Sequence, residues 1–159
     1  MLSRWLSQIA ALLIKISQAL HKNTKSCACS TCTSACTSKP GWFLPGEVTQ
    51  AAHHLGITQK EVFDQSLAVD WYRETLVLAP AVIGHEGRMY PEDAYEQCVF
   101  FQNNKCSIHA VKPFECRNYL HDTSKKELQA THDSVAAAWV DHQSEVYEIS
   151  PNANIPKTP

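Results

Sequence analysis

Apolar residues recur at helical spacing along the first part of the chain. They occupy one stripe, made of Leu2, Trp5, Leu6, Ile9, Leu13, Ile16 and Leu20. This period predicts an amphipathic helix over residues 2–20, followed by a linker to residue 26. Polar side chains such as Gln8 and Lys15 interrupt the stretch. It therefore lacks the roughly 20 apolar residues in a row that a membrane-spanning helix needs.

The apolar stripe of residues 2–20 must be covered, because a chain that exposed it would aggregate. Its charges are basic only, so the helix could dock on the rest of the domain or make a peripheral contact with an anionic membrane surface. A cleaved export signal ending near Ser17-Gln18-Ala19, or an organellar presequence, is the remaining alternative.

Three further helices are predicted downstream. The first begins near Pro45, buries Val48, Ala51, Ala52 and Leu55, and stops at Gly56. The second opens at Thr58 with a capping box closed by Glu61 and carries Val62, Phe63 and Leu67. The third covers residues 124–142, within a C-terminal segment 123–149 that packs on the domain. Residues 150–159 carry three prolines, which predicts a flexible tail.

Strand signals are weak. Residues 75–82 form a short apolar run, but Pro80 argues against a central strand. Residues 98–101 are β-prone, and Asn103-Asn104 predicts a turn into Cys106. We therefore expect a mainly α fold with little or no sheet, a small irregular domain organised around a Cys-ligated metal site.

The chain is long enough for one domain, with 159 residues. Its charge is uneven: residues 1–46 carry five basic side chains and no acid, while the remainder carries 16 acids and 9 bases. These parts contribute +5 and −7, which gives the net charge of −2. An acidic body argues against a nucleic-acid partner, which would require a basic face.

Six of the seven cysteines fall into two groups that can act as soft metal ligands. Cys29, Cys32 and Cys36 lie in a Ser/Thr/Cys/Ala stretch after Cys27, and Cys98, Cys106 and Cys116 follow about 60 residues later. The first stretch has no apolar period to hold its shape, whereas metal bonds could replace burial. A metal site implies a reducing compartment such as the cytoplasm. An exported protein would instead form disulfides, although seven cysteines leave one unpaired.

The two groups resemble the YkgJ-like cysteine-cluster family of zinc- or iron-chelating domains. Cys29-x2-Cys32 and Cys36 match the first, second and last cysteines of its Cys-x2-Cys-x2-Cys-Cys motif, and Ala35 stands where the family usually has another cysteine. The stretch from Cys98 through Cys106 to Cys116-Arg117, with Lys112-Pro113 inside it, is similar to the second family block. The resemblance spans roughly residues 27–120 and defines a metal-binding domain over residues 27–122. It implies that the metal ligands are drawn from Cys29, Cys32, Cys36, Cys98, Cys106 and Cys116.

All-sulfur ligation suits zinc, copper(I) or an iron–sulfur cluster. Six thiolates exceed the four that one tetrahedral ion or cubane needs, so either two centres form or only four cysteines ligate. A single centre requires the sulfurs of Cys29 and Cys32 to lie within about 4 Å of at least two later cysteines. Basic residues flank the ligands and could offset thiolate charge: Lys39, Lys105, Lys112 and Arg117. We read His109 as a polar contact more readily than as a ligand, since enough cysteines are present.

The leading functional interpretation is a metal-binding protein whose zinc or iron site joins two halves of the domain. An enzyme is the less favoured alternative, either an iron–sulfur oxidoreductase or the accessory domain of a modifying enzyme. No convergent acid–base group in the sequence marks a substrate site. A secreted, disulfide-bonded protein is the third alternative.

Cys27 lies outside the family pattern and is too close to Cys29 to share its ion easily. We expect Cys27→Ser to leave bound metal unchanged and Cys116→Ser to lower it, as measured by elemental analysis of freshly isolated protein. Equal losses from both variants would show that the ligand assignment is wrong.

Overall fold

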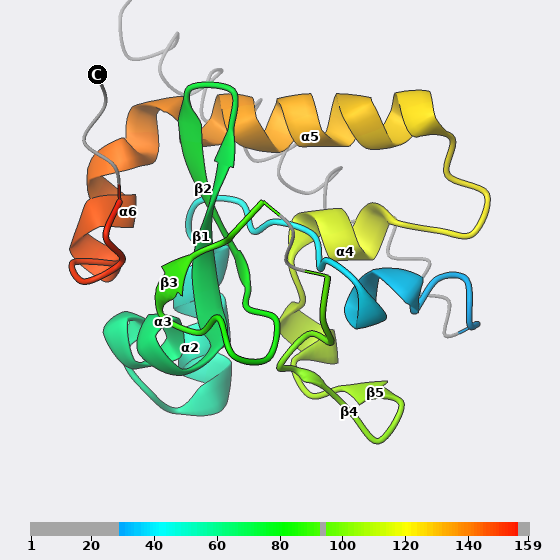
Figure 1. Cartoon of the computed structure of the whole chain (residues 1–159), viewed down its shortest axis with the longest axis horizontal. Coiled ribbons are helices and arrows are strands. Elements are labelled where there is room, and N and C mark those ends of the chain that lie inside the picture. The colour runs from blue at the N-terminus through cyan, green and yellow to red at the C-terminus, as the bar shows by residue number, and fades with distance from the viewer. Residues whose placement is uncertain (1–28, 93–94, 156–159) are drawn as a thin grey trace, which may run out of the picture.

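The computed structural model describes residues 29–92 and 95–155, and Figure 1 shows their arrangement. The predicted helix over residues 2–20 and Cys27 lie outside the described residues. The α-helices are α2 (Glu47–Leu55), α3 (Gln59–Ser66), α4 (Phe114–Asn118), α5 (Lys125–Trp139) and α6 (Gln143–Ile149). Short 3-10 helices are η1 (Ser34–Thr37), η2 (His109–Val111) and η3 (Val140–His142). Within this part of the chain, no helix is long and apolar enough to cross a membrane.

The structure contains more sheet than the sequence predicts. Strands β1 (Leu67–Tyr72) and β2 (Thr75–Pro80) form an antiparallel hairpin. Strand β3 (Arg88–Met89) pairs in parallel with β1, which gives a three-stranded sheet in the order β2-β1-β3. A second, two-stranded sheet consists of β4 (Phe101–Gln102) and β5 (Lys105–Cys106). The expectation of little or no sheet is therefore wrong.

Two local features explain the missed hairpin. Helix α3 ends at Ser66, and Leu67, predicted to be an apolar helix position, adopts the extended conformation that begins β1. Pro80 is the last residue of β2, a strand at the edge of the sheet, where a missing backbone donor is tolerated. The predicted turn at Asn103-Asn104 is confirmed: both residues have positive φ, and the turn places Phe101 opposite Cys106.

The core lies between the β1–β2 hairpin and the helices around it. Helix α2 buries Val48, Ala51 and Ala52 as predicted, and α5 runs across the hairpin on the side of β2 (Figure 1). Trp139 at the end of α5 is fully buried, and its indole N–H donates to the carbonyl of Phe43 at 2.7 Å. After α6, Ala153 is buried in the same core.

Helix α5, which the sequence predicts over residues 124–142, begins with a capping box at Ser124. The Ser124 hydroxyl accepts from the amide of Glu127 at 3.2 Å, and the Glu127 carboxylate accepts from the amide of Ser124 at 2.8 Å. Ser124→Ala should lower the free energy of unfolding by about 1 kcal/mol, because it removes this cap. Ser134→Ala in the middle of the helix is the control, since the Ser134 hydroxyl only donates back to the Ala130 carbonyl. Equal effects on chemical denaturation would contradict the capping role.

Candidate metal centre

Cys29 and Cys32 lie on a tight turn at the start of the described chain. The Thr33 amide donates to the Cys29 carbonyl at 3.0 Å, and the Thr33 hydroxyl donates to the same oxygen at 3.1 Å. These bonds curl the backbone so that the Cys32 amide points at the Cys29 sulfur, 3.5 Å away. The two-residue spacing thus brings both thiols to one side of the turn.

The side chain that completes this pair is His121, which lies between α4 and α5. Its ring Nδ1 is 3.8 Å from the Cys29 sulfur and 3.5 Å from the Cys32 sulfur. Its backbone amide donates to the Cys32 sulfur at 3.1 Å. The ligand atoms of Cys29, Cys32 and His121 all lie within 4.8 Å of one another.

The expectation that Cys29 and Cys32 approach two later cysteines is wrong. Among the described residues, the group with mutually close ligand atoms contains His121 and no cysteine of the second group. His121 was missed because it stands 89 residues after Cys32 and belongs to no spacing motif. A Cys-x2-Cys pair supplies only two metal ligands, and any of the eight histidines in the chain could supply another. This was the feature of the sequence that could have pointed to His121.

The other four cysteines surround a separate hollow. Cys36 lies in η1, Cys98 precedes β4, Cys106 ends β5, and Cys116 lies in α4. All four line one cavity of about 290 Å³, together with Cys32. Cys36 therefore lines the same cavity as the three later cysteines, whereas among the described residues the ligand atoms within 4.8 Å of one another are those of Cys29, Cys32 and His121.

Backbone bonds hold the two segments together at this cavity. The Cys98 amide donates to the Cys36 carbonyl at 2.8 Å. Cys98 also forms an isolated bridge with Val82, just beyond β2. Pairing of β4 with β5 then places Cys106 opposite Phe101. Each cysteine is thus tied to a backbone element, and the sulfurs do not depend on flexible loops for their position.

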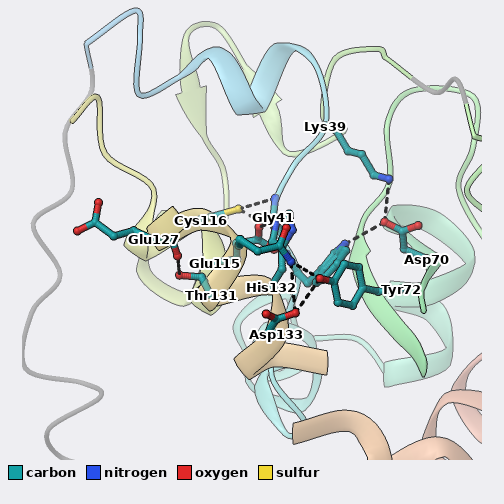
Figure 2. A network of polar contacts seen from close by, with 12 residues as sticks. Lys39, Gly41, Asp70, Tyr72, Glu115, Cys116, Glu127, Thr131, His132 and Asp133 are labelled. Atoms are coloured by element: carbon teal, nitrogen blue, oxygen red, sulfur yellow. Dashed lines mark hydrogen bonds and ion pairs between the residues drawn. The ribbon is translucent and has the colours of Figure 1, made fainter. Parts of the chain in front are cut away.

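The backbone at Gly41 passes close to Cys116 and holds its side chain in place (Figure 2). The Gly41 amide lies 3.2 Å from the Cys116 sulfur and donates to it. The next amide, that of Trp42, donates to the buried carboxylate of Glu115 at 2.8 Å, and the same carboxylate pairs with His132 on α5. A Cβ on Gly41 would lie 2.7 Å from the Glu115 Cβ and 2.9 Å from the Cys116 amide nitrogen. Only glycine fits at this position.

The electrostatics of the cavity disfavour free thiolates. Burial, partly offset by hydrogen bonds from backbone amides, raises the pKa of the Cys98 thiol to about 12. Burial is also the main cause that raises the pKa of Cys36, Cys106 and Cys116, and neighbouring thiols raise it further at Cys36 and Cys116. Lys112 acts in the opposite direction on Cys36 and Cys106. The buried thiols therefore favour the protonated form, and Lys112 offsets only part of the cost of ionising them.

The flanking cations take different roles from one another. Lys105, Lys112 and His109 line the cavity. Arg117 instead pairs with the buried Glu47 carboxylate and donates to the Lys112 carbonyl at 2.6 Å. Lys39 pairs with Asp70 at 2.9 Å. Two of the four predicted cations therefore lie where they can offset charge in the cavity.

The chain matches a protein family that is defined by a cysteine motif. Residues 28–136 match the family model CxxCxxCC, described as "Putative zinc- or iron-chelating domain". The chain belongs to the CxxCxxCC family. The match includes all six described cysteines and His121, and it extends past residue 120 into most of α5. No curated protein and no solved structure matches the chain.

The donor atoms fit the CxxCxxCC description. Thiolate sulfur and imidazole nitrogen are ligands of zinc and iron, whereas magnesium and calcium prefer oxygen. The six described cysteines form no disulfide with one another, so each sulfur can bind a metal. The first CxxCxxCC motif departs from the family pattern at Ala35, beside Cys36.

Gly41→Ala should lower both stability and bound metal, because the added methyl group displaces Glu115 and Cys116. Gly46→Ala is the matched control: its Cβ meets nothing within 4 Å, and its positive φ adds backbone strain alone. That strain costs about 1 kcal/mol and should leave bound metal unchanged. Thermal denaturation and elemental analysis of both variants check this, and loss of metal in Gly46→Ala would contradict it.

Proposed function

We propose that Cys36, Cys98, Cys106 and Cys116 hold one zinc ion or iron centre, which we call the four-thiol centre. It would join residues 29–40 to residues 98–118 and so fix the two cysteine segments on the domain. The observation that carries this proposal is that four cysteines from two distant segments line one cavity. The family description supports a chelated zinc or iron ion.

A bound cation would resolve the electrostatic conflict in the cavity. The buried thiols raise one another's pKa in the free protein, and a metal ion supplies the positive charge that stabilises their thiolates. Four thiolates on a divalent ion leave a charge of −2, which Lys105 and Lys112 at the cavity wall would offset in part.

Zinc in this centre would act in structure, because a site with four protein ligands leaves no open position. Iron would add redox chemistry to the same ligands. Reduced thiols are required in either case, so we also propose a reducing compartment such as the cytoplasm.

The metal is identified by anaerobic purification, elemental analysis and a visible spectrum. A brown sample indicates an iron–sulfur cluster, and a colourless sample with zinc indicates a structural ion. The cysteines of the four-thiol centre are then changed one at a time to serine, with Cys27→Ser as the matched control. Each of the four changes should lower the metal content, and the control should not. Retention of full metal content in Cys36→Ser and Cys98→Ser, or disulfides in place of metal, would overturn the proposal.

Metal affinity should rise with pH, because the pKa values of the four thiols are all raised. Thiols with raised pKa values are protonated near neutrality, and binding requires the thiolate. Each proton released on binding increases the apparent affinity about tenfold per pH unit. Calorimetric titration of zinc in buffers of different ionisation enthalpy measures the proton release. Thiols with pKa values of about 8.5 and above are protonated between pH 6 and 8. A zinc affinity that does not change over this pH range would contradict ligation by these thiols.

A further inference from the structure

We propose a second metal site, made by Cys29, Cys32 and His121 and facing solvent, which we call the surface triad. It would bind zinc through three protein ligands and leave one coordination position open. This site is separate from the four-thiol centre, and its existence does not depend on that centre.

The spacing of the ligand atoms matches tetrahedral zinc. Zinc bonds of about 2.3 Å to sulfur and 2.05 Å to nitrogen, at the tetrahedral angle, place sulfur and nitrogen about 3.6 Å apart. The observed separations from the His121 Nδ1 are 3.5 Å to the Cys32 sulfur and 3.8 Å to the Cys29 sulfur. Two edges of the triad thus match one face of a zinc tetrahedron, and the third, between the two sulfurs, is no longer than 4.8 Å.

Backbone donors already point at both sulfurs. The Cys32 amide lies 3.5 Å from the Cys29 sulfur, and the His121 amide lies 3.1 Å from the Cys32 sulfur. Amide hydrogen bonds stabilise thiolates and orient metal ligands. The Leu120 amide in turn donates to the Thr123 hydroxyl at 2.9 Å, and the Thr123 amide donates to the Leu120 carbonyl at 3.0 Å. This small turn holds His121 against the cysteine pair.

Charge and exposure distinguish the triad from the four-thiol centre. Two thiolates and a neutral imidazole cancel the charge of Zn²⁺, so the triad needs no neighbouring lysine. Cys29 and His121 are exposed, whereas Cys98 is 5% exposed. Among the described residues, no fourth side chain belongs to the triad. Three protein ligands with a fourth position left to water or an incoming ligand is the arrangement of zinc sites that react or exchange.

The two sites are neighbours, because Cys32 belongs to the triad and also lines the four-thiol cavity. Cys29 and His121 do not line that cavity. Changes at these two residues therefore affect the triad selectively.

The test is a zinc titration of the full chain under reducing, oxygen-free conditions, in competition with a chromophoric chelator. The variants are His121→Ala and Cys29→Ser in the triad, Cys98→Ser in the four-thiol centre, and His54→Ala as an exposed histidine control. His121→Cys replaces the imidazole nitrogen with a thiolate sulfur and so keeps three ligands in the triad. Cobalt(II) in place of zinc then reports the number of sulfur ligands through its absorption spectrum.

We expect the unmodified chain and His54→Ala to bind two zinc ions. His121→Ala and Cys29→Ser should lower the affinity for one of these two ions at least about tenfold. Removing a residue that only hydrogen-bonds to a metal ligand already has an effect of about this size, and here a ligand itself is removed. His121→Cys should restore that binding and add sulfur character to the cobalt spectrum, which a merely structural role of His121 would not do.

The surface triad is overturned if His121→Ala binds as much zinc, and as tightly, as the unmodified chain, or if His121→Ala and Cys98→Ser each abolish all binding. A single zinc ion in the unmodified chain that is lost in His121→Ala and retained in Cys98→Ser would support the triad and refute the four-thiol centre.

Discussion

The position of α4 depends on two buried carboxylates, Glu47 in α2 and Glu115 in α4 itself. Glu47 accepts from the amides of Leu44 and Phe114 and pairs with Arg117. Glu115 accepts from the Trp42 amide and pairs with His132 on α5. A helix of five residues has too few internal bonds to be stable alone. Charged, hydrogen-bonded partners therefore fix its place, and with it the place of Cys116.

Local signals in the sequence predict much of this fold. The capping box of α3, the stop of α2 at Gly56 and the turn at Asn103-Asn104 depend on residues close together in the chain, and all three are present. Hairpin β1–β2 was missed because the pattern around Leu67 also suits a helix, and because the position of Pro80 at an edge depends on strand order. Strand order is a tertiary property that no local pattern contains.

The same distinction applies to the candidate site. Residue type and spacing mark the cysteines as candidate ligands, and the family is confirmed by the match over residues 28–136. Residue type and spacing do not predict that Cys29 and Cys32 lie beside His121 while the other four cysteines line a cavity. This arrangement follows from where α4 ends and α5 begins, and hence from the packing of α4 against α5 and of α5 against β2. The buried carboxylates Glu47 and Glu115, which decide that packing at α4, look like surface charges in the sequence.

The sequence distance between ligands has a consequence for the order of folding. Cys29 and His121 are 92 residues apart, whereas the β1–β2 hairpin closes across a two-residue turn. Closing a long loop has a larger entropic cost than closing a short one, so distant contacts form after local ones have shortened the effective chain. The hairpin and the helices on it would thus assemble first, and the cysteine segments would converge on a scaffold that already exists. In a newly made chain, binding of the proposed metal would then be a late step that stabilises the folded domain rather than one that starts its folding.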